Sequence, residues 1–308
     1  MGKKGKRAAK AKEGTDAKPI SAGRARRERA AAQREIDAKL DIFIERLEVE
    51  LADRDLFSPI AEMEDCPICL VPLPFDHGKH TFMPCCGKTI CCGCTHKHNM
   101  VARSVDVPCE FCRADAFMEP QKIADAMQRL VDGGSVHAVS SLGVLYAEVA
   151  KGKMVGMGGN LIGANLDQRA VELHLEAAER GHFGSVFDLA KLFREGTLVK
   201  KDSAKAEKLA VAAAKLGDLQ AHFLLGDMYV EDGCPLHLLP ETSRSHFIFA
   251  ARNGDSRAMN IIRNLRQTDN ICEGDFDEID DAFKEAAKIQ WTEEREAYAS
   301  LLSGNRIE

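Results

Sequence analysis

The sequence predicts a mostly α-helical protein in which a small, metal-bound cysteine-rich domain precedes an α-solenoid, an array of stacked antiparallel helix pairs. Nine of the eleven cysteines lie between Cys66 and Cys112. Beyond them, a pattern of two alanines followed by a glycine recurs at Gly181, Gly217 and Gly254, within a long stretch of helical periodicity. A chain of 308 residues, 45% of them hydrophobic, is long enough for about two domains, which excludes a wholly disordered protein.

Residues 1–34 form a basic arm that we expect to be disordered. They contain 12 lysines and arginines against 3 acidic residues, a net charge of +9, and almost no large apolar side chains. The rest of the chain contains 30 basic and 45 acidic residues, a net charge of −15. The basic clusters fit a nuclear-localisation or nucleic-acid patch, or equally a solubilising tail. Because the body is acidic, we do not expect nucleic acid to be its partner.

The sequence shows no targeting or membrane-spanning segment. No apolar stretch follows the basic N-terminus as in a signal peptide, and no window approaches the ~18 apolar residues that cross a bilayer. We therefore expect a cytoplasmic or nuclear protein without a membrane partner. In these reducing compartments, clustered thiols favour metal binding over disulfide formation.

Residues 35–60 are predicted to contain an amphipathic helix. Ile36, Leu40, Phe43, Leu47 and Leu51 follow one another at steps of three or four residues, with charged residues between them. The stripe is too short to indicate a free-standing coiled coil. It either packs on the domain that follows or forms the seam of a dimer.

The cysteines are spaced for two tetrahedral zinc sites. Three pairs have the spacing Cys-x-x-Cys, which turns two thiolates toward one point. They are Cys66 with Cys69, Cys91 with Cys94, and Cys109 with Cys112. Two closed sites need eight ligands, and the adjacent Cys85 and Cys86 complete that number, with Cys92 left over. Since so short a segment has no large core, we expect bound zinc to supply its folding energy.

The order of these pairs over residues 61–118 resembles the RING finger family, in an all-cysteine variant. The resemblance implies an interleaved cross-brace with two structural zinc ions. One ion would be held by Cys66, Cys69, Cys91 and Cys94, and the other by Cys85, Cys86, Cys109 and Cys112. The second site departs from the family, because Lys88 stands where a histidine is common. Since the neighbours Cys85 and Cys86 are poorly placed to bind the same ion, one of them could be replaced. The alternative ligands are His98 and His80.

The resemblance also implies how such a domain would act. RING ubiquitin ligases have no catalytic nucleophile of their own; they position a ubiquitin-conjugating enzyme that is charged with ubiquitin. In the family, an apolar residue between the first two cysteines contacts that enzyme, and a basic residue after the last cysteine bridges it to ubiquitin. Ile68 and Arg113 stand at these positions. In two respects the chain departs from the family. Glu110 and Phe111 replace the usual proline between the last two cysteines, and the preceding helix lacks its usual aromatic residue.

Residues 119–270 contain a repeated helical unit. The segment 177–181 recurs at 213–217 and 250–254, so that the glycines are 36 and 37 residues apart. A Leu-Gly-x-x-Tyr pattern accompanies it, as at 142–146. These features resemble the Sel-one-like repeat, a relative of the tetratricopeptide repeat, in which glycine ends the second helix of each pair. Three repeats over about 127–254 and a partial fourth imply a solenoid that binds a protein or peptide along its surface.

The remaining segments show no catalytic motif. The glycine-rich insert at 154–164 lacks a phosphate-binding motif and is expected to be a loop. Residues 271–308 begin with acidic residues that suit the start of a helix. Cys234 and Cys272 are isolated thiols, expected to be buried or inert. Four histidines of the repeat region are expected in packing or surface positions. They are His137, His174, His182 and His222.

Together these patterns predict a RING-type ubiquitin ligase whose helical repeats recruit a substrate or partner. Its other partner would be a ubiquitin-conjugating enzyme, and no residue of the chain would be catalytic. The alternative is a zinc-stabilised interaction scaffold that transfers no ubiquitin.

Overall fold

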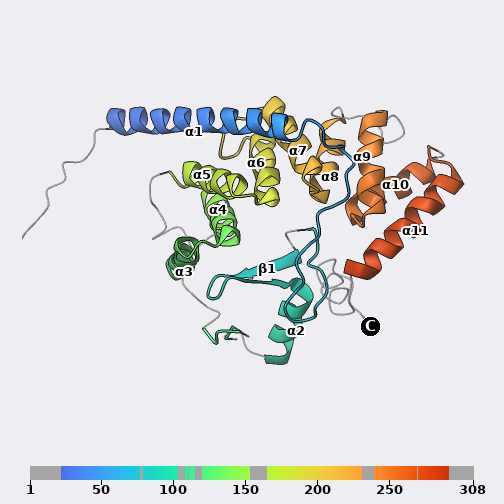
Figure 1. Cartoon of the computed structure of the whole chain (residues 1–308), viewed down its shortest axis with the longest axis horizontal. Helices are drawn as coiled ribbons and strands as arrows, with labels where there is room; N and C mark the ends of the chain where they lie inside the picture. The colour runs from blue at the N-terminus through green and yellow to red at the C-terminus, as the bar shows by residue number, and fades with distance from the viewer. Residues whose placement is uncertain are drawn as a thin grey trace, which may run out of the picture.

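The computed structural model shows a mostly helical protein with one small sheet. It describes residues 22–76, 79–102, 108–109, 111–114, 120–152, 165–230, 239–268 and 270–290. Figure 1 shows a long helix, α1 (Ala22–Glu50), on one side of an arc of shorter helices, with the cysteine-rich module on the other side. The fold class predicted from the sequence is confirmed, with stacked helix pairs next to a small cysteine-rich module.

The helices of the arc run in sequence order along it. They are α3 (Pro120–Asp132), α4 (Val136–Ala150), α5 (Leu166–Glu179), α6 (Phe183–Glu195), α7 (Ser203–Lys215), α8 (Leu219–Met228), α9 (Glu241–Arg252), α10 (Ser256–Gln267) and α11 (Glu273–Gln290). Each packs on its neighbours in the chain, as in a solenoid of antiparallel pairs.

The repeated glycines end the second helix of each pair. Gly181, Gly217 and Gly254 lie in the left-handed region with φ of 89°, 92° and 93°, where a residue with a Cβ atom is strained. The amide that follows donates back to a carbonyl five residues earlier, as from His182 to Ala177 at 3.0 Å. This pair of features is the glycine-dependent helix stop that the sequence pattern predicted.

The residue after each glycine then caps the next helix. Its side chain accepts a hydrogen bond from an amide in the first turn, which satisfies one of the unpaired N–H groups there. Three of these capping residues are His182, Asp218 and Asp255, and Ser135 does the same after Gly134, which ends α3 with a φ of 90°. A glycine stop followed at once by a side-chain cap makes a compact turn, and this turn places successive helices antiparallel.

At two of the contacts within helix pairs, a glycine on the first helix lies against an aromatic ring on the second. A Cβ atom at Gly226 would lie 2.7 Å from the ring of Phe247, and one at Gly143 would lie 3.1 Å from the ring of His174. In the middle repeat the equivalent position holds Ala190, and an alanine replaces the ring at the partner position. The Leu-Gly pattern therefore marks close contact between helices, because the ring fills the space that a side chain would need.

Helix α1 packs on the repeats and not on the cysteine module. Its buried face has the predicted stripe and one further isoleucine. These residues are Ile36, Leu40, Phe43, Ile44, Leu47 and Leu51. They share one apolar core with residues of α5 to α8, and ion pairs join Asp41 and Glu48 to lysines of α7. The helix was predicted correctly, but its partner was not. Because the stripe is buried within the chain, it forms neither a dimer seam nor a contact with the module that follows.

Helix α1 also begins earlier than expected, inside the arm that we predicted to be disordered. Residues 22–34 are mostly alanine, arginine and glutamate, which are good helix formers. Arg29 forms an ion pair with Asp167 on α5, and its carbonyl accepts a hydrogen bond from Gln168 at 2.9 Å. Contacts with the repeats therefore extend the helix over residues that have no apolar stripe. Residues 1–21 lie outside the described part of the chain.

The segment between α1 and the cysteine module is fastened to the repeats. The amide of Ala61 donates to the carbonyl of Gly217 at 3.0 Å. A Cβ atom at Gly217 would lie 2.5 Å from that amide nitrogen, so this approach requires glycine. Nearby, the ring of Phe57 packs on His222 and His246, with centroids 5.5 and 5.2 Å apart. These contacts fix where the module sits on the arc.

The C-terminal helix α11 packs on α9 and α10. Phe276 and Ile279 are buried there, and the first turn carries Glu273 and Asp275, as the acidic helix start predicted. Cys272, expected to be buried or inert, is exposed. The rest of the predicted 271–308 segment, beyond Gln290, lies outside the described residues, as do the 154–164 insert and Cys234. Among the described helices, none combines the length and apolarity needed to cross a membrane.

Candidate metal centre

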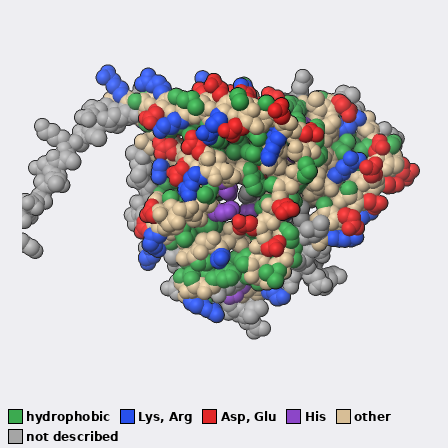
Figure 2. Space-filling view, viewed as in Figure 1, with side chains coloured by type: hydrophobic (Ala, Val, Ile, Leu, Met, Phe, Trp, Pro, Cys, Tyr) green, Lys and Arg blue, Asp and Glu red, His purple; other side chains and the backbone are tan. Residues whose placement is uncertain are grey.

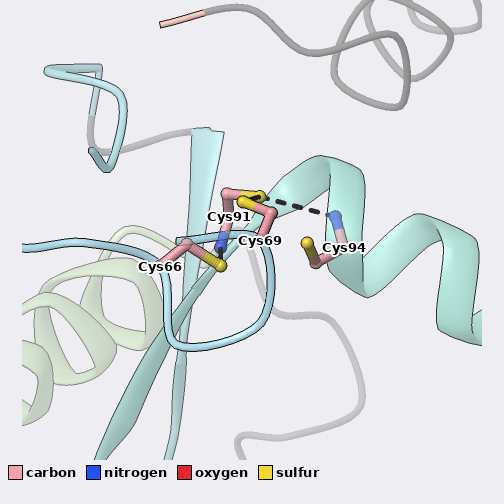
Figure 3. Close-up of side chains that lie close together, drawn as sticks. All are labelled: Cys66, Cys69, Cys91 and Cys94. Atoms are coloured by element: carbon pink, nitrogen blue, oxygen red, sulfur yellow. Dashed lines mark hydrogen bonds between the residues drawn. The ribbon is translucent and has the colours of Figure 1, made fainter. Parts of the chain in front are cut away.

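Four cysteine thiols from three segments meet at one end of a small hairpin sheet. The hairpin pairs β1 (His80–Met83) with β2 (Lys88–Cys91), and α2 (Cys92–Ala102) follows directly. The Sγ atoms of Cys66, Cys69, Cys91 and Cys94 all lie within 4.8 Å of one another. Figure 3 shows the first two on the loop before the sheet, Cys91 at the end of β2 and Cys94 on α2. The structure thus brings together the first set of ligands that the RING resemblance implied.

The loop that carries Cys66 and Cys69 is a tight turn closed by backbone hydrogen bonds. The amide of Leu70 donates to the carbonyl of Cys66 at 2.9 Å, and the amide of Cys66 donates to Val71 at 2.9 Å. Leu70 has a φ of 56°, a left-handed conformation that costs an ordinary residue ~1–2 kcal/mol. The strained turn carries both thiols of the pair to the same ligand cluster.

A second quartet uses the same turn. Its thiols, also within 4.8 Å of one another, belong to Cys85, Cys86, Cys109 and Cys112. The amide of Arg113 donates to the carbonyl of Cys109 at 3.0 Å, and Arg113 has a φ of 59°, so it occupies the place that Leu70 has in the first loop. The two loops are therefore equivalent in backbone structure although they share only their cysteines.

The adjacent Cys85 and Cys86 both reach the second quartet. They lie in the turn between β1 and β2, where the amide of Gly87 donates to the carbonyl of Met83 at 2.8 Å and Gly87 has a φ of 71°. This turn matches the two cysteine loops, with Met83 at the position of the first cysteine and Cys86 at that of the second. Cys85 is thus an additional thiol carried by the same turn, which explains how neighbours can face one point.

The alternative ligands lie elsewhere in the module. His80 stands in β1 opposite Cys91, and His98 lies on α2; within the described residues, neither histidine belongs to a quartet. The surplus Cys92 is buried at the start of α2, where it lines a small cavity with Phe75. The structure therefore favours the eight-cysteine arrangement over one completed by histidine.

The two quartets interleave along the chain. The first and third groups of cysteines form one quartet, and the second and fourth groups form the other. Each site therefore needs residues from both halves of the module, and neither half can complete a site alone. This is the connectivity of a cross-brace.

The donor set and its spacing fit zinc. A tetrahedral zinc ion with Zn–S bonds of ~2.3 Å separates its sulfur ligands by about 3.8 Å. The Sγ atoms of Cys69 and Cys91 are 3.9 Å apart, and those of Cys86 and Cys109 are 3.8 Å apart. These distances are far from the ~2.05 Å of a disulfide. Four thiols with no carboxylate among them suit a thiophilic ion such as zinc better than magnesium or calcium.

Backbone amides prepare one thiol in each quartet for metal binding. Burial opposes ionisation of Cys66, but the amides of Cys91 and two residues of its own loop lower its pKa to about 7. Burial also opposes ionisation of Cys109, and the amides of Cys112 and Phe111 lower its pKa to about 7. Burial raises the pKa of Cys94 and of Cys85, whose sulfurs also lie beside other thiols. Each quartet thus holds a thiol that favours the thiolate form, and a cation is needed to ionise the rest.

The module has little apolar core to hold it together without metal. Leu73 and Ile90 are buried beside the first quartet, at 4% and 1% exposure, and most of the rest of this cluster is cysteine. Burying one such side chain contributes ~1.5–3 kcal/mol, whereas structural zinc sites supply ~10–16 kcal/mol. A metal ion in each quartet would therefore dominate the stability of the module.

The residues proposed for enzyme contact lie on the loops of the quartets. Ile68 is 43% exposed between the two cysteines of the first loop, and Leu70 beside it is 74% exposed. Arg113 follows the last cysteine and is also exposed, and Phe111 before it is 42% exposed. Apolar side chains exposed on rigid loops are typical of a contact surface.

Sequence analysis missed a buried histidine pair in the repeats. His222 and His246 are 1% and 3% exposed, and their Nδ1 atoms lie 3.0 Å apart. Aligning the repeats on their glycines could have revealed it, because the position of His222 holds Val139 and Val186 in the earlier copies. His182 serves as a helix cap instead, and His174 is a packing residue, as expected.

The fold and the site together define a helical-repeat protein with a small cysteine module that can hold two metal ions. No family model and no curated protein matches the chain. Among solved structures, it is similar to a Sel1 repeat protein from Oxalobacter formigenes, with 20% sequence identity and a TM-score of 0.34. That match covers 55% of this chain and 80% of the other.

Proposed function

We propose that the protein is a RING-type ubiquitin ligase whose Sel-one-like repeats recruit the substrate or partner. The observation that carries the proposal is the interleaving of two four-cysteine sites around a hairpin and a helix. The order and spacing of the cysteines resemble the RING finger family. The chain supplies no nucleophile; it binds a charged ubiquitin-conjugating enzyme on one surface and a protein partner on the other.

In this proposal zinc is structural, and the protein's own side chains make the contacts. The ions would hold the two equivalent loops at a fixed separation, one carrying Ile68 and the other followed by Arg113. Ile68 would pack on the conjugating enzyme, and the guanidinium of Arg113 would donate hydrogen bonds to that enzyme and ubiquitin. The exposure of both residues supports these roles. Because free thiols persist in reducing compartments, we propose that the protein acts in the cytoplasm or nucleus.

The test is ubiquitin transfer by the full, zinc-loaded chain with activating enzyme, a panel of conjugating enzymes and ubiquitin. Ile68→Ala and Arg113→Ala should each lower the rate of ubiquitin discharge by about tenfold or more, a loss of ~1.4 kcal/mol in transition-state stabilisation. The matched controls are Ile42→Ala and Arg27→Ala, which truncate exposed side chains of α1. The absence of discharge with every conjugating enzyme, despite two bound zinc ions, would refute ligase activity.

A zinc-stabilised scaffold without ubiquitin transfer is the second candidate. It is favoured by the absence of the proline that ligases of the RING family commonly have between the last two cysteines; Glu110 and Phe111 stand there, and Phe111 is 42% exposed. Under this alternative the module binds a protein through the same exposed loops. Stable binding of a conjugating enzyme without discharge of its ubiquitin would support the scaffold.

A further inference from the structure

A cavity of about 800 Å³ lies between the cysteine module and the first repeats. Residues of α4, of α6 and of the turn before α6 form one wall. The other wall comes from the module and the extended segment leading into it, through Glu62, Met63, Glu64, Leu73, Phe82 and Thr89. Figure 2 shows histidine side chains gathered in a hollow near the middle of this face. The volume lies in the range of clefts that bind small ligands or short peptide segments.

The module forms this cavity because it touches the arc at two separated places. At one place, Phe82 packs against the core of α3 to α5, and Gly87 lies so near α3 that a Cβ atom on it would be 3.4 Å from the side chain of Leu130. At the other, the side-chain amide of Gln220 on α8 donates to the carbonyl of Phe75 at 2.6 Å. Between the two contacts the module spans the concave side of α4 and α6 without filling it.

The charged groups of the cavity favour a cationic occupant. Within the described residues, no lysine or arginine forms an ion pair with Glu62, Glu64 or Asp188. Their basic neighbours are imidazole rings: that of His137 lies 3.7 Å from Glu64, and that of His174 lies 3.7 Å from Asp188. Arg180, one of the two basic residues in the wall, is engaged elsewhere: it donates to Glu176 at 3.3 Å and to the carbonyl of Gly134 at 2.6 Å. The lining thus offers three carboxylates without a lysine or arginine partner, and Lys191 is the second basic residue of the wall.

The cavity also offers apolar surface next to these carboxylates. Val144 on α4 is 43% exposed, at a position that holds Lys191, Asp227 and Asn264 in the later repeats. Met63, Phe82 and Phe183 line the same space. A groove that combines carboxylates with apolar side chains suits a segment in which lysine or arginine alternates with apolar residues.

We propose that this cavity binds a basic–apolar peptide segment of a partner protein, held between the repeats and the cysteine module. Phosphate groups of nucleic acid would be repelled by Glu62, Glu64 and Asp188, and the net charge of −15 outside the arm favours a basic partner in the same way. The inference deepens the proposed function, since it assigns a binding site and a chemical class to the substrate. Peptide binding itself requires no ubiquitin transfer.

The test is fluorescence anisotropy with the full, zinc-loaded chain and two labelled synthetic peptides. In one peptide, lysine alternates with leucine and phenylalanine; in the other, glutamate replaces each lysine. The lysine peptide should bind, and the glutamate peptide should bind at least about tenfold more weakly. The double variant Glu62→Gln/Glu64→Gln should weaken lysine-peptide binding about fivefold, as expected for two partly exposed ion pairs. Val144→Asn, which places a polar amide on the apolar wall without adding charge, should weaken binding of the lysine peptide about fivefold, because the leucine and phenylalanine side chains lose apolar contact.

Matched controls separate the cavity from the rest of the surface. Glu45→Gln and Val49→Asn change exposed residues of α1 in the same way and should leave peptide affinity unchanged. Circular dichroism of each variant verifies that the helices remain. Equal binding of both peptides, or an equal effect of the α1 controls, would overturn the proposal. If a chain lacking residues 1–21 binds the lysine peptide at least tenfold more tightly than the full chain, the basic arm is the occupant, and an external partner is the wrong assignment.

The outcome is independent of ligase activity, because the assay contains neither ubiquitin nor a conjugating enzyme. Binding of the lysine peptide without ubiquitin discharge would support the peptide site and refute the ligase activity. Discharge of ubiquitin with equal binding of the lysine and glutamate peptides would support the ligase activity and refute the peptide site.

Discussion

The cysteine module and the helical repeats reach a defined structure by different means. In the repeats, each helix pair buries leucines and alanines against its neighbours, and the turns between pairs reuse one glycine stop and one side-chain cap. The described residues of the module instead form two strands and one helix, and among them Leu73 and Ile90 are the buried aliphatic side chains beside the first quartet. The comparison teaches that periodic packing stabilises one region, whereas the other has two cysteine quartets that can hold metal in place of a large apolar core. The predictions below test this difference.

Removal of metal should have the largest effect, and it should be confined to the module. A strong chelator at neutral pH should unfold the module, because each zinc site contributes ~10–16 kcal/mol, whereas most helical circular dichroism should remain. Mass spectrometry of the native protein should find two zinc ions per chain, and Cys69→Ser should lower the number to one. Cys92→Ser is the matched control and should retain both ions. Complete loss of helix on chelation would show that the two regions are one cooperative unit.

Truncation of the α1 stripe should destabilise the repeats. Leu40 is fully buried against them, so Leu40→Ala should lower the free energy of unfolding by ~2–5 kcal/mol in urea titrations. Ile42→Ala, on the exposed face of the same helix, should change it by less than ~0.5 kcal/mol. An unfolding midpoint that depends on protein concentration would contradict this assignment, because it would place the stripe in a dimer.

Two equivalent glycines should differ because only one of them touches the segment that leads to the module. At Gly181 a Cβ atom would meet nothing within 4 Å, so Gly181→Ala should cost only the ~1–2 kcal/mol of its left-handed conformation. Gly217→Ala has the same backbone cost, and its Cβ atom would also collide with Ala61, which should add ~1–3 kcal/mol. Thermal unfolding of the two variants measures the difference. Equal costs would mean that the segment is not fastened at Gly217.

The buried histidine pair should make the stability of the repeats sensitive to acid. Burial lowers the pKa of His222 to about 3 and that of His246 to about 4, whereas both rise to about 6.5 on unfolding. Stability should therefore be fully present above pH 6.5 and fall as the pH drops toward 4, since only the unfolded chain binds these protons. The slope is at most ~1.4 kcal/mol per pH unit for each histidine.

The double variant His222→Met/His246→Leu restores apolar residues found at the same positions of other repeats and should remove this part of the slope. Urea unfolding between pH 7 and pH 4 provides the measurement. If wild type and double variant fall in parallel, the pair does not titrate on unfolding and the assigned direction of the shift is wrong.

Features encoded by local spacing could be predicted from the sequence. The Cys-x-x-Cys pairs reveal the thiol clusters because a tight turn of four residues directs both of its cysteine side chains toward one point. The recurring glycines reveal the helix stops because their left-handed conformation is a local requirement. The sequence analysis left open whether the adjacent Cys85 and Cys86 could bind the same ion. Both could have been assigned to the second quartet, because the turn that ends at Gly87 is equivalent to the other two cysteine loops.

Features that depend on which surfaces meet could not be predicted. The stripe of α1 shows that one face must be covered, but periodicity does not identify the cover, and the repeats that cover it lie far along the chain. The cavity between the module and α4 and α6 has no sequence signal, because its walls come from segments distant in sequence. The roles of Ile68 and Arg113 were inferred from the RING resemblance alone, and their contacts with a conjugating enzyme stay predictions.

The two contacts between the module and the arc limit how many repeats can lie between them. One anchor lies at α3 and the other at α8, so the helices between them set the length of the gap that the module bridges. Inserting one helix pair between α5 and α6 would lengthen the arc while the module kept its size, and one anchor would have to detach. Deleting a pair would press the walls together. In this protein, the copy number of the repeat between Leu130 and Gln220 is therefore constrained by a domain that contains no repeat.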